Sequence, residues 1–195
     1  MNRPGADDPG WRPALGGSLW GLVPSIGIAR TQAKVRRGEL DGLVALRSLF
    51  IALPTTLVLV GVVVVVLWTT ADLEAAFSGG PVAVAVGVAG LVLLVASTVV
   101  ARLDGTSEAS LAESYRRRFF LRMGLSESAA LLGFVGFILT DNPAIYPLGA
   151  AFSAVGFALL APTAANLARD QEALHRYGTR TSLLQALRAS SPPGR

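Results

Sequence analysis

The sequence predicts an all-α fold: a polytopic membrane bundle of four transmembrane helices, with amphipathic cytoplasmic helices attached. Four apolar segments each approach the ~20 residues that an α-helix needs to cross a bilayer. All 17 Lys and Arg residues lie outside them, and the chain of 195 residues is 52% hydrophobic and 15% charged, which is too apolar for an ordinary soluble domain. The four segments are Leu49 to Trp68, Val82 to Val100, Met123 to Thr140 and Ile145 to Ala161.

The distribution of basic residues predicts the orientation. One basic group precedes the first span, a second lies between spans two and three, and a third follows span four. The charged residues of the other two connections, Asp72, Glu74 and Asp141, are all acidic. Because Lys and Arg favour the cytoplasmic side, we expect an inner (plasma) membrane protein with N and C termini in the cytoplasm. The three basic groups are Arg30, Lys34, Arg36, Arg37 and Arg47; Arg102, Arg116, Arg117, Arg118 and Arg122; and Arg169, Arg176, Arg180, Arg188 and Arg195.

The segments outside the spans divide the chain into four regions. Residues 1–17 are rich in Pro and Gly, which predicts a disordered cytoplasmic tail. Residues 18–42 form an interfacial and juxtamembrane segment, 43–162 the transmembrane domain, and 163–195 an amphipathic cytoplasmic C-terminal tail. The apolar stretch from Leu15 to Ala29 is short and broken by Pro24, so we expect it to lie in the interface, with a further crossing as the alternative.

Local patterns place the helices. Ala33 to Leu46 continues with helical spacing into span one, where Pro54 predicts a kink. Span two alternates small and branched residues, which allows close helix approach. Ser107 begins a helix that runs without interruption to Thr140, and Asp141 to Pro143 form the turn that ends it. After span four, the patterns predict an amphipathic helix over Thr163 to Tyr177 and a short surface helix over Ser182 to Ala189.

A faint internal repeat leaves open a duplicated helical hairpin. At an offset of 72 residues, identical pairs align spans one and three: Leu53 with Leu125, Leu59 with Leu131, Gly61 with Gly133, and Val63 with Val135.

The composition argues against several classes of function. There is no Cys, which excludes disulfides, thiolate metal sites and cysteine nucleophiles. A single histidine, His175, offers neither a zinc ligand set nor a catalytic triad, and no phosphate-binding loop or hydrolase elbow is present. The net charge of +4 is spread over juxtamembrane stretches, which indicates topology and anionic lipid rather than nucleic acid. We expect no enzymatic activity, no cofactor and no metal.

Glu127 is the single charged residue inside a span, and a carboxyl in that setting is a functional candidate. It lies in the cytoplasmic leaflet, five residues beyond Arg122, and about 140° around the helix from it. Other helices must therefore supply its partner, and we expect a buried polar layer with Arg47 as the counter-ion. Candidate members of this layer are Arg47, Ser97, Thr98, Thr163 and Asn166.

Two interpretations of Glu127 stay open. It either fixes helix register, by pairing with Arg47 or by bonding to Thr98 in its protonated form, or it binds and releases a proton or cation. Beside it, Ser126, Ala129, Gly133, Gly136 and Thr140 form a stripe of small residues that predicts a helix-packing seam.

The stretch Tyr115 to Leu139 (YRRRFFLRMGLSESAALLGFVGFIL) resembles the carboxylate-bearing helix of the ATP synthase proteolipid, subunit c. The preceding span is similar to that family's Gly-rich helix, and together the two cover about 60 residues; a long Arg-rich helix replaces the family's short polar loop. The resemblance implies that Glu127 corresponds to the ion-binding carboxylate.

Together these observations predict a small integral membrane protein with a structural role or a role in protein and lipid interaction. Arg116, Arg117, Arg118 and Arg122 are the candidate contacts to anionic headgroups, and a second copy or another membrane protein is a candidate partner. The alternative is a proton- or cation-binding membrane subunit, similar to a proteolipid, that uses Glu127.

Overall fold

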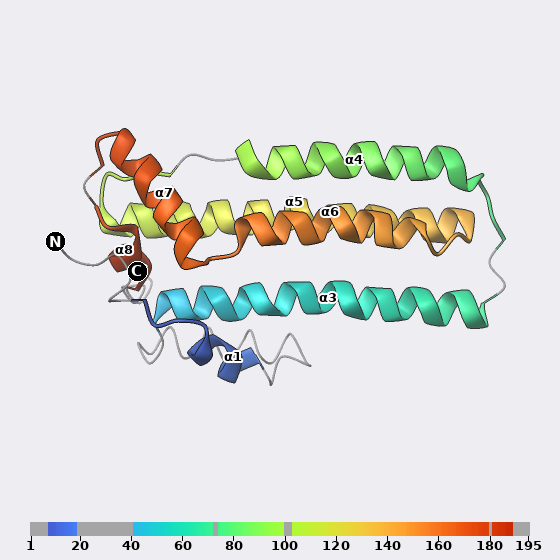
Figure 1. The fold of residues 1–195 in the computed structure, drawn as a ribbon, viewed down its shortest axis with the longest axis horizontal. Coiled ribbons are helices and arrows are strands. Elements are labelled where there is room, and N and C mark those ends of the chain that lie inside the picture. The colour runs from blue at the N-terminus through green and yellow to red at the C-terminus, as the bar shows by residue number, and fades with distance from the viewer. Residues whose placement is uncertain (1–7, 19–40, 72–73, 100–102, 180, 189–195) are drawn as a thin grey trace, which may run out of the picture. The chain divides into compact units, whose positions relative to one another are not determined.

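The computed structural model describes residues 8–18, 41–71, 74–99, 103–179 and 181–188, and all regular structure in these ranges is helical (Figure 1). This confirms the predicted all-α class for the described residues. The helices are α1 (Arg12–Ser18), α3 (Gly42–Thr70), α4 (Gly79–Val99), α5 (Glu108–Thr140), α6 (Ile145–Leu160), α7 (Ala164–Arg176) and α8 (Leu183–Arg188).

Three of these helices, α3, α4 and α5, are long and apolar enough to cross a membrane. α6 has 16 residues and meets the same test only together with α7, across the break at residues 161–163. The helix from Ser107 to Thr140 was predicted to be continuous, and α5 confirms it. It ends where Asp141 adopts a φ of 50°, and the Asn142 side chain then accepts a hydrogen bond from the Ala144 amide at 3.0 Å.

The chain forms two compact units. Unit 1 comprises Met1–Ala52, Arg102–Arg118 and Ala161–Arg195, and unit 2 comprises Leu53–Ala101 and Phe119–Leu160. The transmembrane domain predicted from residue 43 therefore begins within unit 1, because the first turns of α3 belong to that unit.

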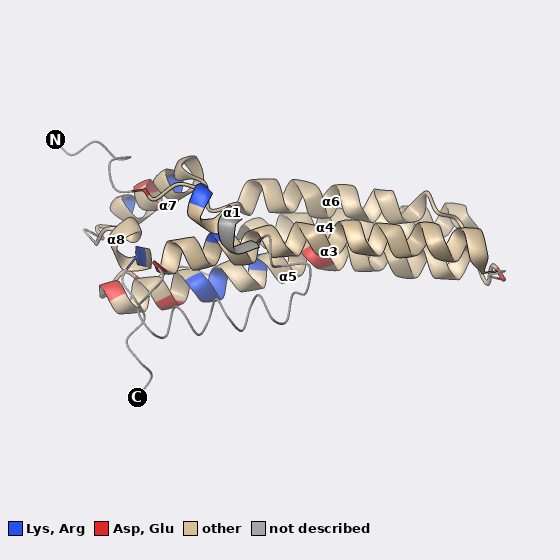
Figure 2. Cartoon of the chain, turned by 90° about the horizontal axis from the view of Figure 1, so that it is seen from below, with Lys and Arg blue, Asp and Glu red and all other residues tan. Residues whose placement is uncertain are grey.

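Unit 2 consists of α4, α6 and the parts of α3 and α5 that fall within it, and these four helices run side by side (Figure 1). α4 and α6 contain no charged residue and are uncoloured in Figure 2. Gly133 of α5 and Gly149 of α6 face each other so closely that a Cβ at Gly149 would lie 2.3 Å from the Ala129 carbonyl oxygen. The predicted seam of small residues on α5 is thus a contact with α6 at Gly133.

The contact between α3 and α6 depends on Tyr146. Its hydroxyl donates a hydrogen bond to the Leu57 carbonyl, and its ring lies against Gly61, where a Cβ would be 3.3 Å from the ring. Tyr146 also belongs to a cluster of buried residues in this unit, with Val64, Ala130 and Phe137. A large aromatic side chain on one helix is therefore accommodated by a glycine on the other.

Unit 1 has its own apolar interior, to which α1, the first turns of α3 and α5, α7 and α8 all contribute. The large side chains at its centre are at most 6% exposed: Leu43, Leu46, Leu111, Tyr115, Leu167, Leu174, Leu183 and Leu187. On α7 the buried leucines are seven residues apart, so they share one helix face.

The structure corrects part of the predicted disordered tail. Residues 8–18 include α1, Ala14 has no exposed surface, and the Trp11 ring packs edge-on against Phe50 of α3 at 5.9 Å. The low apolar content of residues 1–17 concealed Trp11, whose ring contacts Phe50, and Ala14, whose carbonyl accepts a hydrogen bond from Ser48. The expectations for residues 19–40, which hold most of the interfacial segment and much of the lead-in to span one, lie outside the described residues.

Candidate functional site

The first candidate site lies in unit 1, around Arg47 of α3. α3 begins after Asp41, whose side chain accepts a hydrogen bond from the Leu43 amide at 2.9 Å and so satisfies one free donor of the helix. Leu43 and Val44 are buried, and Arg47, four and three residues later, falls on the same face. The guanidinium consequently has no exposed surface, and a buried cation requires close polar partners.

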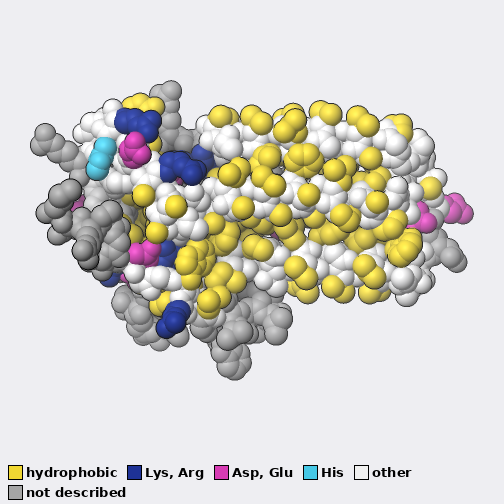
Figure 3. Space-filling view, in the orientation of Figure 1, with side chains coloured by type: hydrophobic (Ala, Val, Ile, Leu, Met, Phe, Trp, Pro, Cys, Tyr) yellow, Lys and Arg dark blue, Asp and Glu magenta, His cyan; other side chains and the backbone are white. Residues whose placement is uncertain are grey.

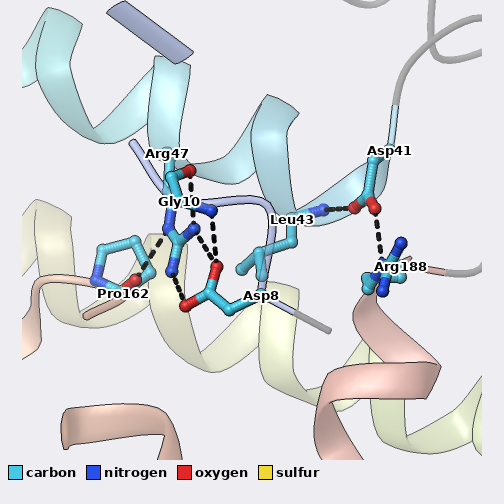
Figure 4. A network of polar contacts seen from close by, with 7 residues as sticks. All are labelled: Asp8, Gly10, Asp41, Leu43, Arg47, Pro162 and Arg188. Carbon is cyan, nitrogen blue, oxygen red and sulfur yellow. Dashed lines mark hydrogen bonds and ion pairs between the residues drawn. The ribbon is translucent and has the colours of Figure 1, made fainter. Parts of the chain in front are cut away.

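Arg47 finds these partners in the N-terminal segment and at the break between α6 and α7 (Figure 4). Its NH1 and NH2 groups bind the two carboxylate oxygens of Asp8 at 2.5 and 2.8 Å. NH1 also donates to the Gly10 carbonyl at 2.8 Å, and Nε donates to the Pro162 carbonyl at 3.0 Å. The Trp11 ring centre lies 5.1 Å from the guanidinium carbon, a distance at which the aromatic face stabilises the cation.

Asp8 is positioned by a tight turn. Its Oδ1 accepts a hydrogen bond from the Gly10 amide at 2.9 Å, and Gly10 has a φ of +74°, a conformation that glycine adopts without steric cost. The hydrogen bond from Arg47 lowers the pKa of Asp8 below its ordinary value of 3.8, although partial burial acts in the opposite direction. The ion pair is therefore charged at neutral pH.

A second ion pair lies nearby in the same unit. Nε of Arg188 in α8 donates to Oδ2 of Asp41 at 2.8 Å, and both side chains are more exposed than Arg47 (Figure 4). Asp41 thus binds both the start of α3 and the end of α8.

The break between α6 and α7 is held by side chains whose role the sequence did not reveal. Thr163 is the N-cap of α7 and accepts a hydrogen bond from the Asn166 amide at 3.2 Å. The Asn166 side chain donates to the Ala161 carbonyl at 2.9 Å. With Arg47 on the Pro162 carbonyl, both backbone oxygens before the cap have donors, so Thr163 and Asn166 serve the helix termini here.

The structure gives Arg47 a different partner from the expected one. Each of its three guanidinium nitrogens is bonded within unit 1, and its counter-ion is Asp8 rather than Glu127. The sequence could not indicate this partner, because Asp8 lies 39 residues earlier in a region that looked disordered.

In unit 2 the remaining members of the predicted layer bond mainly to backbone. The Ser97 hydroxyl is fully buried and donates to the Leu94 carbonyl, and the Thr98 hydroxyl donates to the Val95 carbonyl, both at 2.7 Å. The Thr98 carbonyl receives a hydrogen bond from Arg122 of α5. Thr98 therefore contacts Arg122 of α5 through its own backbone carbonyl, whereas its hydroxyl bonds within α4.

Glu127 is half-buried on α5, and within the described part of the chain its carboxylate has no hydrogen-bond or ion-pair partner. The helical turn that contains it is modified by α6. The Ser153 hydroxyl donates to the Ser126 carbonyl at 2.5 Å and accepts from the Ala130 amide at 2.9 Å. These two groups would ordinarily bond to each other in a helix, so a side chain of α6 interacts with the backbone hydrogen-bond ladder of α5 at the turn of Glu127.

The basic residues of α5 occupy different environments. Arg118 forms an ion pair with Asp170 of α7 at 2.9 Å, Arg116 is partly buried, and Arg117 is exposed. Of the four arginines predicted to contact headgroups, Arg117 is the one whose side chain is most open to its surroundings.

Sequence reasoning missed Asp8, Trp11 and Ser153. The Asp-Pro-Gly sequence at residues 8–10 was the available signal for an ordered turn, whereas nothing local distinguished Ser153 from other small residues in an apolar span.

No protein-family model, curated protein or solved structure matches this chain. Among the described residues, no group of three or more His, Asp or Glu side chains is placed to hold a metal ion.

Proposed function

We propose that this chain is a four-span integral protein of the inner membrane with a structural role or a role in protein and lipid interaction. The observation that carries the proposal is the arrangement of side chains in unit 2. Large apolar residues are exposed on its outside, whereas small and hydroxyl-bearing residues lie inside together with apolar ones such as Val64 and Phe137.

On the face drawn in Figure 3, hydrophobic side chains lie along the helices of unit 2. Val58 on α3 and Val84 on α4 are each 67% exposed, and Val155 on α6 is 48% exposed. Inside, Ser97 and Ser153 have no exposed surface and Ala129 has 2%. Exposing a large apolar side chain to water costs about 1.5–3 kcal/mol, whereas in lipid it costs nothing, and small residues then allow close helix contact. The arrangement favours a lipid environment.

α6 is the proposed fourth span. Its 16 residues correspond to about 24 Å of helix, somewhat less than the ~30 Å hydrocarbon core, a mismatch that local bilayer thinning accommodates. It contains no charge and packs against α4 and α5 through Gly149, Ser153 and Gly156. A helix packed this closely among spanning helices shares their depth.

The basic segments before α3, between α4 and α5 and after α6 are proposed to face the cytoplasm, in agreement with the positive-inside rule. There, α7 would lie along the interface as an amphipathic helix, with Leu167 and Leu174 directed into the protein and Arg169 and Arg176 exposed. Arg117 and its neighbours Arg116, Arg118 and Arg122 would contact anionic headgroups.

Single-cysteine labelling tests this topology, because the native chain has no Cys. Ser78→Cys and His175→Cys place an exposed thiol before α4 and near the end of α7. In intact spheroplasts, a membrane-impermeant maleimide should label position 78, and position 175 only after permeabilisation. Labelling of both positions from outside would show that α6 does not cross.

We propose a proton- or cation-binding role for Glu127 as the second candidate function. It is favoured by the half-burial of Glu127 without a described partner, in a turn whose backbone bonds to Ser153. The resemblance of Tyr115 to Leu139 to subunit c supports the same role.

Carbodiimide labelling in native membranes, with Glu127→Gln as the control, tests this second candidate. Labelling of Glu127 that fades as pH rises from 5 to 9 would support a protonated, lipid-accessible carboxyl. Absence of labelling at every pH would contradict it and leave a packing role.

A further inference from the structure

The Arg47 site has the construction of an anion-binding site. A guanidinium offers a planar pair of donors that matches a carboxylate or a phosphate equally well. In this chain the donors NH1 and NH2 are filled by both oxygens of Asp8, while Nε is fixed by the Pro162 carbonyl and Trp11 covers one side. The Pro162 carbonyl and the Trp11 ring therefore help to hold the guanidinium in place, in addition to Asp8.

The occupant of this site belongs to the segment of residues 8–18, which also contacts α3 beyond the ion pair. The Gly10 carbonyl accepts a hydrogen bond from Arg47, the Ala14 carbonyl accepts one from Ser48 at 3.4 Å, and the Trp11 ring packs against Phe50. The Asp8 side chain is 15% exposed, whereas Arg47 is 0% exposed. An external anion would therefore reach Arg47 by taking the place of Asp8.

The position of the site along α3 favours a lipid as that anion. Arg47 precedes the apolar run that starts at Leu49 by two residues, about 3 Å of helix. The Trp11 and Phe50 rings lie beside it, and Trp is enriched at headgroup depth. If α3 crosses the membrane as proposed above, the site lies at the level of the lipid phosphates.

We propose that Arg47 forms a binding site for the phosphate of an anionic lipid, which Asp8 occupies as an internal ligand when no lipid is bound. The exchange replaces one monoanion with another, so the buried guanidinium stays neutralised. Asp8 belongs to the same chain and therefore competes as an intramolecular ligand, whereas a leaflet rich in anionic headgroups supplies the competing phosphates. Lipid binding then releases residues 8–18 from α3, which makes this segment a latch that responds to lipid composition.

The test follows the distance between the latch and α7, both in unit 1. Leu15→Cys on α1 and Ala168→Cys on α7 place spin labels at exposed positions, and double electron–electron resonance reports their distance. The full chain is reconstituted in nanodiscs of phosphatidylcholine or of phosphatidylcholine with phosphatidylglycerol. A third sample contains phosphatidylcholine with inorganic phosphate, and a fourth has chloride at the same ionic strength.

We expect a narrow distance distribution in phosphatidylcholine and a broad, longer one with phosphatidylglycerol, with neither phosphate nor chloride reproducing the change. The Asp8→Asn variant should already give a broad distance distribution in phosphatidylcholine, and phosphatidylglycerol should not change it further. Asp41→Asn, which removes the neighbouring pair with Arg188, should respond like the native latch.

An unchanged distribution with phosphatidylglycerol would overturn the inference, as would an equal change with inorganic phosphate or chloride. A narrow Asp8→Asn distribution in phosphatidylcholine would do the same. The inference rests on the membrane location proposed for α3, but the two can fail separately: a chain with the four-span cysteine pattern and no lipid response contradicts the latch alone.

Discussion

Arg47 is bound by both carboxylate oxygens of Asp8, and this pair joins a fully buried cation to a residue 39 positions earlier in the chain. The same guanidinium binds the Pro162 carbonyl. The Arg47 side chain therefore joins the N-terminal segment, the start of α3 and the break before α7.

Removal of the Asp8 carboxylate should strongly destabilise unit 1. Asp8→Asn leaves the buried guanidinium without its counter-ion, and loss of one partner of a buried pair costs about 3–5 kcal/mol. The matched control is Glu172→Gln, which breaks an ion pair with Arg176 whose side chains are 67% and 71% exposed and should cost at most ~0.5 kcal/mol. Thermal unfolding in detergent measures both; equal effects would refute the structural role of the Asp8 pair.

The contribution of Asp8 to stability should disappear in acid. Since Arg47 holds the pKa of folded Asp8 below 3.8, the unfolded chain takes up this proton first as pH falls. The stabilisation is complete above about pH 5 and declines as pH falls through the ordinary value towards the lower folded pKa. The difference in melting temperature between the native chain and Asp8→Asn should thus be constant from pH 8 to about 5 and shrink below about pH 4. A difference in melting temperature that grows in acid would contradict the stabilising ion pair between Asp8 and Arg47.

Substitution of Gly149 should disrupt the contact between α5 and α6. A Cβ there would meet the Ala129 carbonyl at 2.3 Å and the Gly133 Cα at 2.9 Å, and backbone atoms cannot move aside without separating the helices. Gly149→Ala should therefore cost about 1–3 kcal/mol. Gly87→Ala on α4, where no atom lies within 4 Å, should be neutral or slightly stabilising. Unfolding in mixed detergent micelles compares the two, and a neutral Gly149→Ala would show that this close approach does not form.

Loss of the Ser153 hydroxyl should have a smaller effect. It removes two hydrogen bonds to the α5 backbone, and polar contacts between membrane helices contribute about 0.6 kcal/mol on average and at most ~1.7. Ser153→Ala should therefore destabilise by about 1 kcal/mol. The hydroxyl of Ser128 bonds to the Gly124 carbonyl of its own helix, so Ser128→Ala should change stability by less than ~0.5 kcal/mol. A larger loss of stability in Ser128→Ala than in Ser153→Ala would contradict the proposed contribution of the Ser153 hydroxyl.

Much of the helical framework could be predicted from the sequence, because hydrophobic length and turn residues act locally. The continuous α5 followed from the spacing of Leu111, Tyr115 and Phe119, and its end followed from Asp141 to Pro143. The start of α3 at Gly42, well before the predicted first span at Leu49, is consistent with the lead-in that the same spacing predicted.

The polar contacts could not be predicted in the same way. The sequence identified Arg47 as a cation in need of a partner, but the partner lies in a segment whose composition is typical of disorder. Ser153 was also missed, because a hydroxyl that inserts between two backbone groups of another helix depends on register, which periodicity alone does not determine. Thr163 and Asn166 lay near each other as expected, yet as a helix cap rather than as a polar layer around Glu127.

The central claim is that the exposed large apolar side chains of unit 2 face lipid, whereas its buried side chains pack between the helices. The oxygen accessibility of single spin labels in nanodiscs tests this claim. Two pairs of nearby positions are compared, one pair on α3 and one on α4. Val65 on α3 and Val88 on α4 are 58% and 60% exposed, whereas Val64 and Val86 are 3% and 6% exposed. Positions 65 and 88 should show the high oxygen accessibility of the bilayer interior and positions 64 and 86 low accessibility. Equal values at all four positions, or the reverse order, would contradict the account.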